Sequence, residues 1–312
     1  MKCTIQNIAD HLGLSRNTVS KALKNSSEVS ENTRNLVIKT ASKLGYKNAT
    51  FATPVIPASE TGSNGTILFL TRTYASDSEF WTTVLRGIES ILSNANYHLA
   101  ISIMSDSDLK QLNFPQTISD SSIKGIILVE ICDKVVCDAL SQFNLPIVSV
   151  DMPNVPFEEL NGIDVVTMES KKNLKKIINQ LIEKGAESFG FVGDLYSPNV
   201  SRGFQERYNA LSECLAEHQL PLNQKNCLLH QTPEDFRNFQ TTVNNLQAMI
   251  SLPDVFICGN DWTAIQLIYA LQFLGFQIPK DICVVGFDNI PAASRISPSL
   301  TTISLSLIHI SE

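Results

Sequence analysis

The 312-residue sequence lacks the marks of several protein classes. No apolar run approaches the ~18 residues that a membrane-spanning helix needs, and the N-terminal segment MKCTIQNIADHLG lacks the charged-then-apolar layout of a signal peptide. The seven cysteines include no C-x-x-C pair, which argues against a zinc site and a disulfide framework. We therefore expect a cytoplasmic protein with reduced thiols, no cofactor, no metal and no membrane partner.

Signatures of catalysis are also missing. The sequence contains no phosphate-binding G-x-x-x-x-G-K-[ST] loop, no H-E-x-x-H metal motif and no G-x-S-x-G nucleophile elbow. Its five histidines are isolated from one another. These absences predict that the protein is not an enzyme, although residues that are distant in the sequence can still converge in a fold.

What is present is an ordinary globular composition with an uneven distribution of charge. Hydrophobic residues make up 43% and charged residues 18%, enough apolar material for one large domain or two ordinary ones. Residues 1–50 contain eight Lys/Arg and three Asp/Glu, a balance of +5, whereas the remainder carries 16 against 28, or −12. A basic head on an acidic body predicts that the head binds a polyanion.

Two short helices are predicted at the N-terminus. Thr4 is placed to cap the first and Ser15 the second, and Gly13 permits the positive φ of the turn between them. The first helix has one apolar face, formed by Ile5, Ile8, Ala9 and Leu12. The second has an inward face of Val19, Ala22 and Leu23 and a wholly polar outward face of Arg16, Asn17, Ser20, Lys21 and Lys24.

A third helix is predicted from a Ser30 cap to Gly45. Its apolar side consists of Leu36, Val37, Thr40, Ala41 and Leu44. A helix, a short glycine turn and a short polar-faced helix make a helix-turn-helix arrangement, whose second helix enters the major groove of DNA. The alternative is a surface helix whose charges are simply solvated.

The segment TIQNIADHLGLSRNTVSKALKNSSEVSENTRNLVIKTASKLGY (residues 4–46) resembles the DNA-binding head of the lactose-repressor/galactose-repressor (LacI/GalR) family. The resemblance implies that the base-reading positions are Arg16, Asn17 and Lys21. The resemblance also implies that the phosphate contacts are Thr4, Ser15, Thr18, Ser20, Ser30 and Thr33. The chemistry agrees, because Arg and Lys donate to guanine, Asn pairs with adenine, and hydroxyls hold phosphates.

After this head (residues 1–48), residues 49–64 have the low charge, prolines and Ser/Thr content of a linker. The family usually has a hinge helix here, with a P-N…A-R-x-L pattern and a leucine that wedges into the minor groove. That pattern is absent, and Pro54 and Pro57 oppose a regular helix. Phe51 and Ile56 are candidates to replace that leucine as the wedge. The alternative is that the linker is a disordered tether.

From Gly65 onward, apolar runs alternate with amphipathic segments such as Trp81–Ala95. This alternation predicts parallel sheets covered on both faces by helices. The predicted strands are TILFLT (66–71), HLAISIM, GIILVE, PIVSV, SFGFVG, DVFICG and ICVVGF. Residues 65–303 also resemble the family's sensor domain, an α/β two-lobed domain like the periplasmic sugar-binding proteins, so we expect an effector-binding and dimerisation domain over residues 65–304.

Polar side chains that follow strands are candidates to line a cleft between the lobes. Asp151 follows PIVSV, Asn260 and Asp261 follow VFICG, and Asp288 follows VVGF. The resemblance makes Asn260 and Asp288 effector contacts. For Asp151 and Asp261, helix capping or a structural role is the alternative.

Three further positions complete the candidate effector site. The resemblance matches Arg207, in ERYNAL, with an arginine that clamps the ligand, although Ala210 stands where a glycine is usual. It matches Phe80 and Trp81 with aromatic positions that stack on a sugar or base; a core anchor is the alternative for Trp81. Arg72, just beyond the first strand, is a candidate for a second cation in the effector site, beside Arg207.

The last eight residues, LSLIHISE (305–312), resemble a translated sequencing adapter. The family continues beyond SLTTI by roughly a helix and a strand. We therefore expect a natural protein that is longer at this end. A native divergent tail is the alternative.

Taken with the resemblance, the sequence predicts a ligand-responsive transcriptional repressor. It would bind a pseudo-palindromic operator in double-stranded DNA as a homodimer and sense a small sugar- or nucleoside-like metabolite. The alternatives are a solute-binding protein with no regulatory role and a DNA-binding head on a divergent enzyme.

Overall fold

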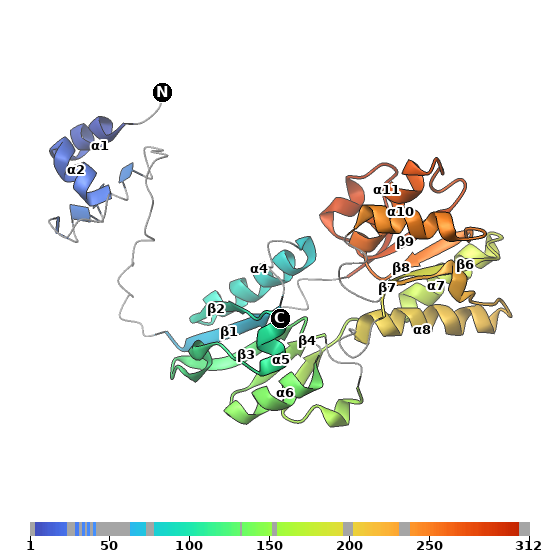
Figure 1. The fold of residues 1–312 in the computed structure, drawn as a ribbon. Coiled ribbons are helices and arrows are strands. Elements are labelled where there is room, and N and C mark those ends of the chain that lie inside the picture. The colour runs from blue at the N-terminus through green and yellow to red at the C-terminus, as the bar shows by residue number, and fades with distance from the viewer. Residues whose placement is uncertain are drawn as a thin grey trace. The chain divides into compact units, whose positions relative to one another are not determined.

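The computed structural model describes residues 4–23, 29–30, 33–34, 36–37, 40–41, 63–72, 78–131, 133–151, 155–195, 202–230 and 238–305. The chain divides into two compact units, Met1–Gly62 (unit 1) and Ser63–Glu312 (unit 2) (Figure 1). Several predicted features lie outside the described residues, namely Lys24, Leu44, Gly45, the linker as far as residue 62, and the tail from residue 306.

Unit 1 begins with two helices joined by a tight turn, α1 (Ile5–Leu12) and α2 (Arg16–Leu23). Thr4 caps α1, and Gly13 ends it with φ 63°, a left-handed conformation that favours glycine. The predicted inward faces are confirmed, since the buried core of unit 1 contains Ile8, Ala9, Val19, Ala22, Val29, Val37 and Ala41.

The third helix differs from its prediction at one position. Residues 33–34, 36–37 and 40–41 are helical, but Leu36, predicted on the buried side, is 50% exposed. Val37, Thr40 and Ala41 are spaced at i, i+3 and i+4 and already cover the buried face. Leu36 lies about 100° around the helix from Val37 and therefore faces water.

The first lobe of unit 2 is a five-stranded parallel sheet with the order β2-β1-β3-β4-β5. Its strands are β1 (Gly65–Thr71), β2 (Tyr97–Ile103), β3 (Ile123–Val129), β4 (Ile147–Val150) and β5 (Ile163–Val166). Successive side chains of β1 face opposite sides, so Phe69 packs with α4 (Glu79–Asn94). Leu68 and Leu70 pack on the other face, with α5 (Asp106–Gln111) and α6 (Lys134–Leu140).

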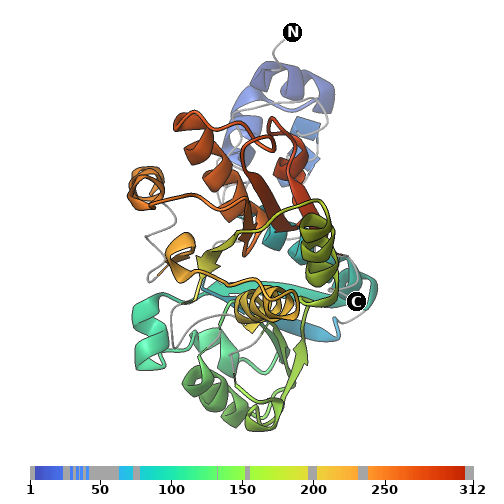
Figure 2. The ribbon, with the colours of Figure 1, turned by 90° about the vertical axis from the view of Figure 1, so that its right-hand side faces the viewer.

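The second lobe is also a five-stranded parallel sheet, with the order β10-β9-β8-β6-β7. Its strands are β6 (Phe189–Asp194), β7 (Leu228–His230), β8 (Val255–Cys258), β9 (Cys283–Asp288) and β10 (Thr301–Ser304). One face is covered by α7 (Lys172–Glu183) and α8 (Arg202–Glu217). The other is covered by α10 (Phe239–Ala248) and α11 (Asp261–Phe273). Figure 2 turns this lobe toward the viewer.

Short 3-10 helices complete the connections of unit 2: η2 (Gln116–Ser119), η3 (Ser141–Phe143), η4 (Phe157–Glu159), η5 (Gln224–Asn226) and η6 (Pro291–Ser294). None of the helices within the described ranges is long and apolar enough to cross a membrane. The described residues also contain no cluster of three His, Cys, Asp or Glu placed to hold a metal ion.

The predicted fold class, a small helical head followed by two parallel α/β lobes, is confirmed. All seven predicted strands are present, whereas β5, β7 and β10 had not been predicted. These three strands have only three or four residues each and lie at the edges of their sheets. An edge strand is covered on fewer sides, so it lacks the continuous apolar run that identifies a central strand.

Candidate functional site

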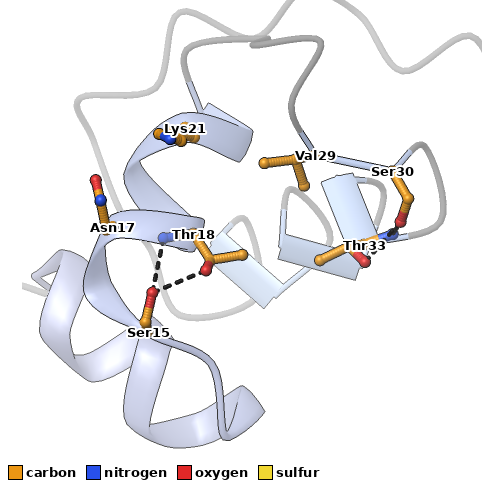
Figure 3. A pocket seen from close by; sticks show the side chains of 7 residues that line it. All are labelled: Ser15, Asn17, Thr18, Lys21, Val29, Ser30 and Thr33. Atoms are coloured by element: carbon orange, nitrogen blue, oxygen red, sulfur yellow. Dashed lines mark hydrogen bonds between the residues drawn. The ribbon is translucent and has the colours of Figure 1, made fainter.

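The candidate DNA contacts of unit 1 are organised by two serine caps of the same pattern. Ser15 Oγ accepts a hydrogen bond from the amide of Thr18 at 3.0 Å and lies 2.8 Å from the Thr18 hydroxyl (Figure 3). Ser30 Oγ likewise accepts from the amide of Thr33 at 3.4 Å and lies 2.8 Å from its hydroxyl. These bonds begin two helices and hold four hydroxyl groups in defined positions.

The hydroxyl groups of both caps line one open hollow of about 310 Å³ (Figure 3). Its lining is Ser15, Asn17, Thr18, Lys21, Val29, Ser30 and Thr33. Six of these seven were predicted to contact DNA, two of them as base readers and four as phosphate contacts. The structure therefore places predicted base readers and predicted phosphate contacts on one surface.

The other predicted contacts of unit 1 lie outside this lining. Arg16 is exposed on α2 beside Asn17, and Ser20 is half-buried on the same helix. Thr4 caps α1, where its hydroxyl accepts from the Asn7 amide at 3.3 Å. Because α2 carries two cations and no acidic residue, the face is suited chemically to the phosphates and base edges of DNA.

In unit 2, Arg207 of α8 is only 3% exposed although it carries a full charge. Its Nη1 donates to the carbonyl oxygen of Gly259 at 2.6 Å, and its guanidinium lies 3.7 Å from the ring centre of Phe287. Burial lowers the pKa of Arg207, and nearby carboxyl groups, first that of Asp288, oppose this shift. Its Nε has no hydrogen-bond partner among the described residues.

Asp288 ends β9 beside this arginine with an unusual backbone conformation. Its φ is 115°, a strained value for a residue with a side chain, and the side chain is nearly buried. Burial raises the pKa of Asp288 to about 8; Arg207 lowers it, while Asp261 and Asp151 raise it further. The site therefore combines one buried cation with several carboxyl groups that compete for it.

Asp261 and Asn260, at the start of α11, use their side chains to hold the fold. Asp261 Oδ2 accepts from the amide of Ile290 at 2.8 Å, and Oδ1 accepts from the Thr302 hydroxyl. Gly286 leaves room for this carboxyl group, because a Cβ there would lie 2.3 Å from Asp261 Oδ1. Asn260 Oδ1 caps α11 by accepting from the Thr263 amide at 2.9 Å.

Asp151 belongs to the same group of charges. It follows β4 with φ 67°, and its amide donates to the carbonyl of Val166 at 3.0 Å. It lies close enough to raise the pKa values of both Arg207 and Asp288. Of the predicted effector contacts, the structure thus brings Arg207, Asp288 and Asp151 together.

The aromatic pair and Arg72 have other contacts. Phe80 and Trp81, both on α4, pack edge to face with ring centres 4.7 Å apart, and both are buried in the apolar core. Trp81 Nε1 donates to the carboxylate of Glu130, a residue that had not been predicted. Arg72 Nη2 lies 2.6 Å from Asp106 Oδ1 in an ion pair.

Comparison with known proteins finds one matching family in each of the two units. The family of bacterial regulatory proteins, lacI family, matches residues 4–48, and the periplasmic binding protein-like domain matches residues 178–310. Catabolite control protein A of Staphylococcus xylosus is 27% identical over 97% of this chain and 87% of its own length. The ribose operon repressor of Haemophilus influenzae is 26% identical over 96% of this chain and 86% of its own length.

The chain combines a DNA-binding domain of the lacI family with a periplasmic binding protein-like domain. Two solved structures of low sequence identity share its fold. A lac repressor dimer bound to operator has a TM-score of 0.64 at 18% identity, covering 100% of this chain and 90% of that chain. A complex of the regulator CelR with cellobiose has a TM-score of 0.67 at 17% identity, covering 99% and 90%. Together with the two relatives, these domains make this chain a DNA-binding transcriptional regulator, and the relatives named here are regulators rather than enzymes.

Two contacts between the lobes of unit 2 had no signal in the sequence. Glu79 of α4 accepts from the amide of Ala292 at 2.9 Å and lies 3.4 Å from Arg295 Nη1, more than 200 residues away in the chain. Arg202 of α8 donates to the carbonyl of Val155 at 3.1 Å and lies 4.5 Å above the Phe157 ring. Only the folded structure reveals that these residues join the lobes.

Proposed function

We propose that this regulator is a repressor that binds a pseudo-palindromic operator as a homodimer, and that a small metabolite in unit 2 changes its affinity for DNA. The observation that carries the proposal is the hollow of unit 1, where Asn17 and Lys21 share one surface with the four hydroxyls of the two serine caps and their threonine partners. A surface with donors for base edges beside donors for phosphates suits a duplex.

Within this proposal, the polar face of α2 reads the major groove. Arg16, Asn17 and Lys21 contact base edges, and Thr4, Ser15, Thr18, Ser20, Ser30 and Thr33 contact phosphates. The Asn17 side chain is exposed, so it meets DNA without rearrangement of the core. A bidentate contact from Asn to adenine is worth about 1–3 kcal/mol of discrimination against the wrong base.

A homodimer is favoured by the size of the reading surface and by an apolar face of unit 2. The described part of α2 has only eight residues, and one such helix reads too few base pairs for specificity in a genome. On α11, Trp262, Tyr269 and Phe273 are exposed along one side, and Phe239 of α10 packs edge-on against Phe273. An exposed aromatic face of this kind suits a second copy of the chain.

For the effector, we propose a sugar- or nucleoside-like metabolite at the carboxyl ends of the strands of unit 2. Arg207, Asp288 and Asp151 form the centre of the site, with Asn260, Phe80, Trp81 and Arg72 as further contacts. Arg207 Nε is buried without a protein partner among the described residues, so it is a donor for a ligand hydroxyl.

Selection of binding sites from a random double-stranded DNA library tests the DNA-binding proposal. The full chain should select a sequence with two inverted half-sites. Asn17→Ala should lose about 1–3 kcal/mol of affinity for that sequence and relax its preference at one position of each half-site. His11→Ala, an exposed position on α1, is the matched control and should bind as the parent does.

Thr18→Ala should instead weaken binding to all sequences alike, because a phosphate contact carries no sequence information. If Asn17→Ala keeps the parent's ratio of matched to mismatched affinity, Asn17 is not a base reader. Selection of sites without inverted symmetry would contradict the homodimer.

A further inference from the structure

Glu130, at the carboxyl edge of the first lobe of unit 2, is an acidic residue that the sequence did not mark as an effector contact. It directly follows β3, the central strand of that lobe's sheet. Its φ is 56°, a left-handed value that is uncommon for a residue with a side chain. Such values cluster at ligand-binding sites. Because Glu130 is also only half-buried, it is a candidate for a ligand contact.

The register of the sheet places Glu130 between two proposed effector contacts. The last residue of β3 pairs with the last residue of β1 on one side and with that of β4 on the other. The residues directly after these strand ends are therefore neighbours, in the order Arg72, Glu130 and Asp151. Neighbouring strands lie about 4.8 Å apart. A ligand that reaches both Arg72 and Asp151 therefore lies over Glu130.

Glu130 is also bonded to a third proposed contact. Trp81 lies in the first turn of α4, and its Nε1 donates to Glu130 Oε1. An indole N–H uses one of the two acceptor oxygens of the carboxylate. The other oxygen, Oε2, has no partner among the described residues, and the neighbouring Arg72 pairs instead with Asp106 at 2.6 Å. One acceptor of Glu130 is therefore left for a ligand.

The second lobe supplies the matching donor. Arg207 is only 3% exposed, and its Nε has no hydrogen-bond partner among the described residues. Asp151 raises the pKa of Arg207, so the row that contains Asp151 and Glu130 lies near this guanidinium. The two lobes thus offer an acceptor and a donor to the same space. A ligand with several hydroxyl groups can use both, since a hydroxyl donates and accepts.

We propose that Glu130 is a specificity-determining residue of the effector site: its Oε1 holds the indole of Trp81, and its Oε2 accepts a hydrogen bond from one hydroxyl group of the ligand. This inference rests on the proposed function, which places a sugar- or nucleoside-like metabolite here. Glutamate suits the position because both of its oxygens accept. Glutamine has one oxygen and an NH2 group that only donates, so it can accept only one of these two hydrogen bonds.

NMR of the full chain tests the contact with the indole without any ligand. The chain has two tryptophans, Trp81 and Trp262, so isotope-labelled tryptophan gives two indole N–H signals. The variant Trp81→Phe identifies the signal of Trp81. Glu130→Ala should move that signal and leave the signal of Trp262 in place. A Trp81 signal that stays where it is in Glu130→Ala would overturn the proposal.

Calorimetric titration with glucose, ribose and adenosine tests the contact with the ligand. For each compound that binds the wild type, Glu130→Ala should weaken binding about tenfold, because a hydrogen bond to a charged group is lost. Glu89→Ala removes an exposed carboxylate from α4 and should bind as the wild type does. Unchanged affinity in a folded Glu130→Ala would overturn the inference and leave the proposed function standing. Glu130→Gln gives the same comparison if Glu130→Ala does not fold.

Monodeoxy analogues of a bound compound separate a ligand contact from a purely structural role. One analogue should bind the wild type about tenfold more weakly than its parent and lose little more with Glu130→Ala, because both changes remove the same hydrogen bond. A structural role would weaken every analogue alike, so additive losses throughout would overturn the inference. If none of the three compounds binds the wild type, the proposed class of effector fails, and this inference fails with it.

Discussion

In unit 1 the candidate residues are on the surface and predominantly positive, whereas those at the centre of unit 2 are buried and predominantly negative. Arg16, Asn17 and Lys21 lie on a helix face turned away from the core, while Arg207 and Asp288 have almost no exposed surface. A partner as large as a duplex can be met only by exposed groups. A small ligand can be surrounded, so its contacts can be built inside a fold.

This difference decides how each unit responds to mutation. In unit 1 the proposed contact residues are separate from the seven buried residues of its core, so DNA binding can be lost while folding survives. In unit 2 the guanidinium of Arg207 packs on Phe287, itself a core residue. A change at Arg207 is therefore expected to affect folding and ligand binding together.

The largest effect is expected for Arg207→Ala. The substitution leaves the carboxyl groups of Asp288, Asp261 and Asp151 without their buried cation and empties the space above Phe287. Removing one partner from a buried group of charges costs about 3–5 kcal/mol of stability. Urea denaturation followed by tryptophan fluorescence measures it.

Arg202→Ala serves as the comparison for Arg207→Ala, because this arginine is on the same helix but only partly buried. Its ion pair with Glu206 lies nearer the surface, so the expected loss is about 1 kcal/mol or less. Equal losses of stability in the two variants would show that the burial of Arg207 does not make it more important for stability than Arg202.

The second effect concerns the pH dependence of unit 2. Asp288 has a pKa of about 8 in the fold against an ordinary value of 3.8, so between these values the folded state holds a proton that the unfolded state releases. The free energy of unfolding should therefore fall as the pH rises from about 4 to about 8, by up to about 1.4 kcal/mol per pH unit. Urea denaturation at a series of pH values follows this slope.

Asp288→Asn should flatten that slope, because the amide does not titrate. Part of the slope should remain, since burial also raises the pKa of Asp261. A wild-type protein that gains stability between pH 5 and pH 8 would contradict the burial of Asp288 as an acid beside Asp261, Asp151 and Arg207.

A smaller effect is expected from a cap in unit 1. Ser15→Ala removes the acceptor for the Thr18 amide and should cost about 1 kcal/mol of stability in this unit. Ser15→Asp keeps an acceptor at the cap and should preserve stability, but it places negative charge in the proposed DNA contact and should weaken operator binding. Circular dichroism and DNA titration of both variants separate the cap from the contact.

These contrasts also explain which features the sequence could predict. The caps at Ser15 and Ser30 and the faces of α1 and α2 depend on residues three or four positions apart, a spacing that is visible in a string of letters. The strand ends at Asp151 and Asp288 were visible because a polar residue follows an apolar run. Local order in the sequence was enough for these features.

Contacts across long separations could not be predicted in the same way. Arg207 meets Gly259 and Phe287, which are 52 and 80 positions away, and no local pattern links them. The contact between Glu79 and Arg295 joins the two lobes without any motif. Edge strands such as β5 and β7 were missed because partial exposure removes their apolar run. Tertiary packing decides these features.

The central claim is that a ligand in unit 2 changes the affinity of unit 1 for DNA. The direct measurement is the operator dissociation constant of the full chain at fixed salt. It is measured with and without a saturating concentration of an uncharged sugar or nucleoside whose binding is detected by tryptophan fluorescence. The account predicts a change of at least fivefold, and loss of that change in an Arg207→Lys variant that circular dichroism shows to be folded. An operator dissociation constant that is the same with and without the bound ligand would contradict it.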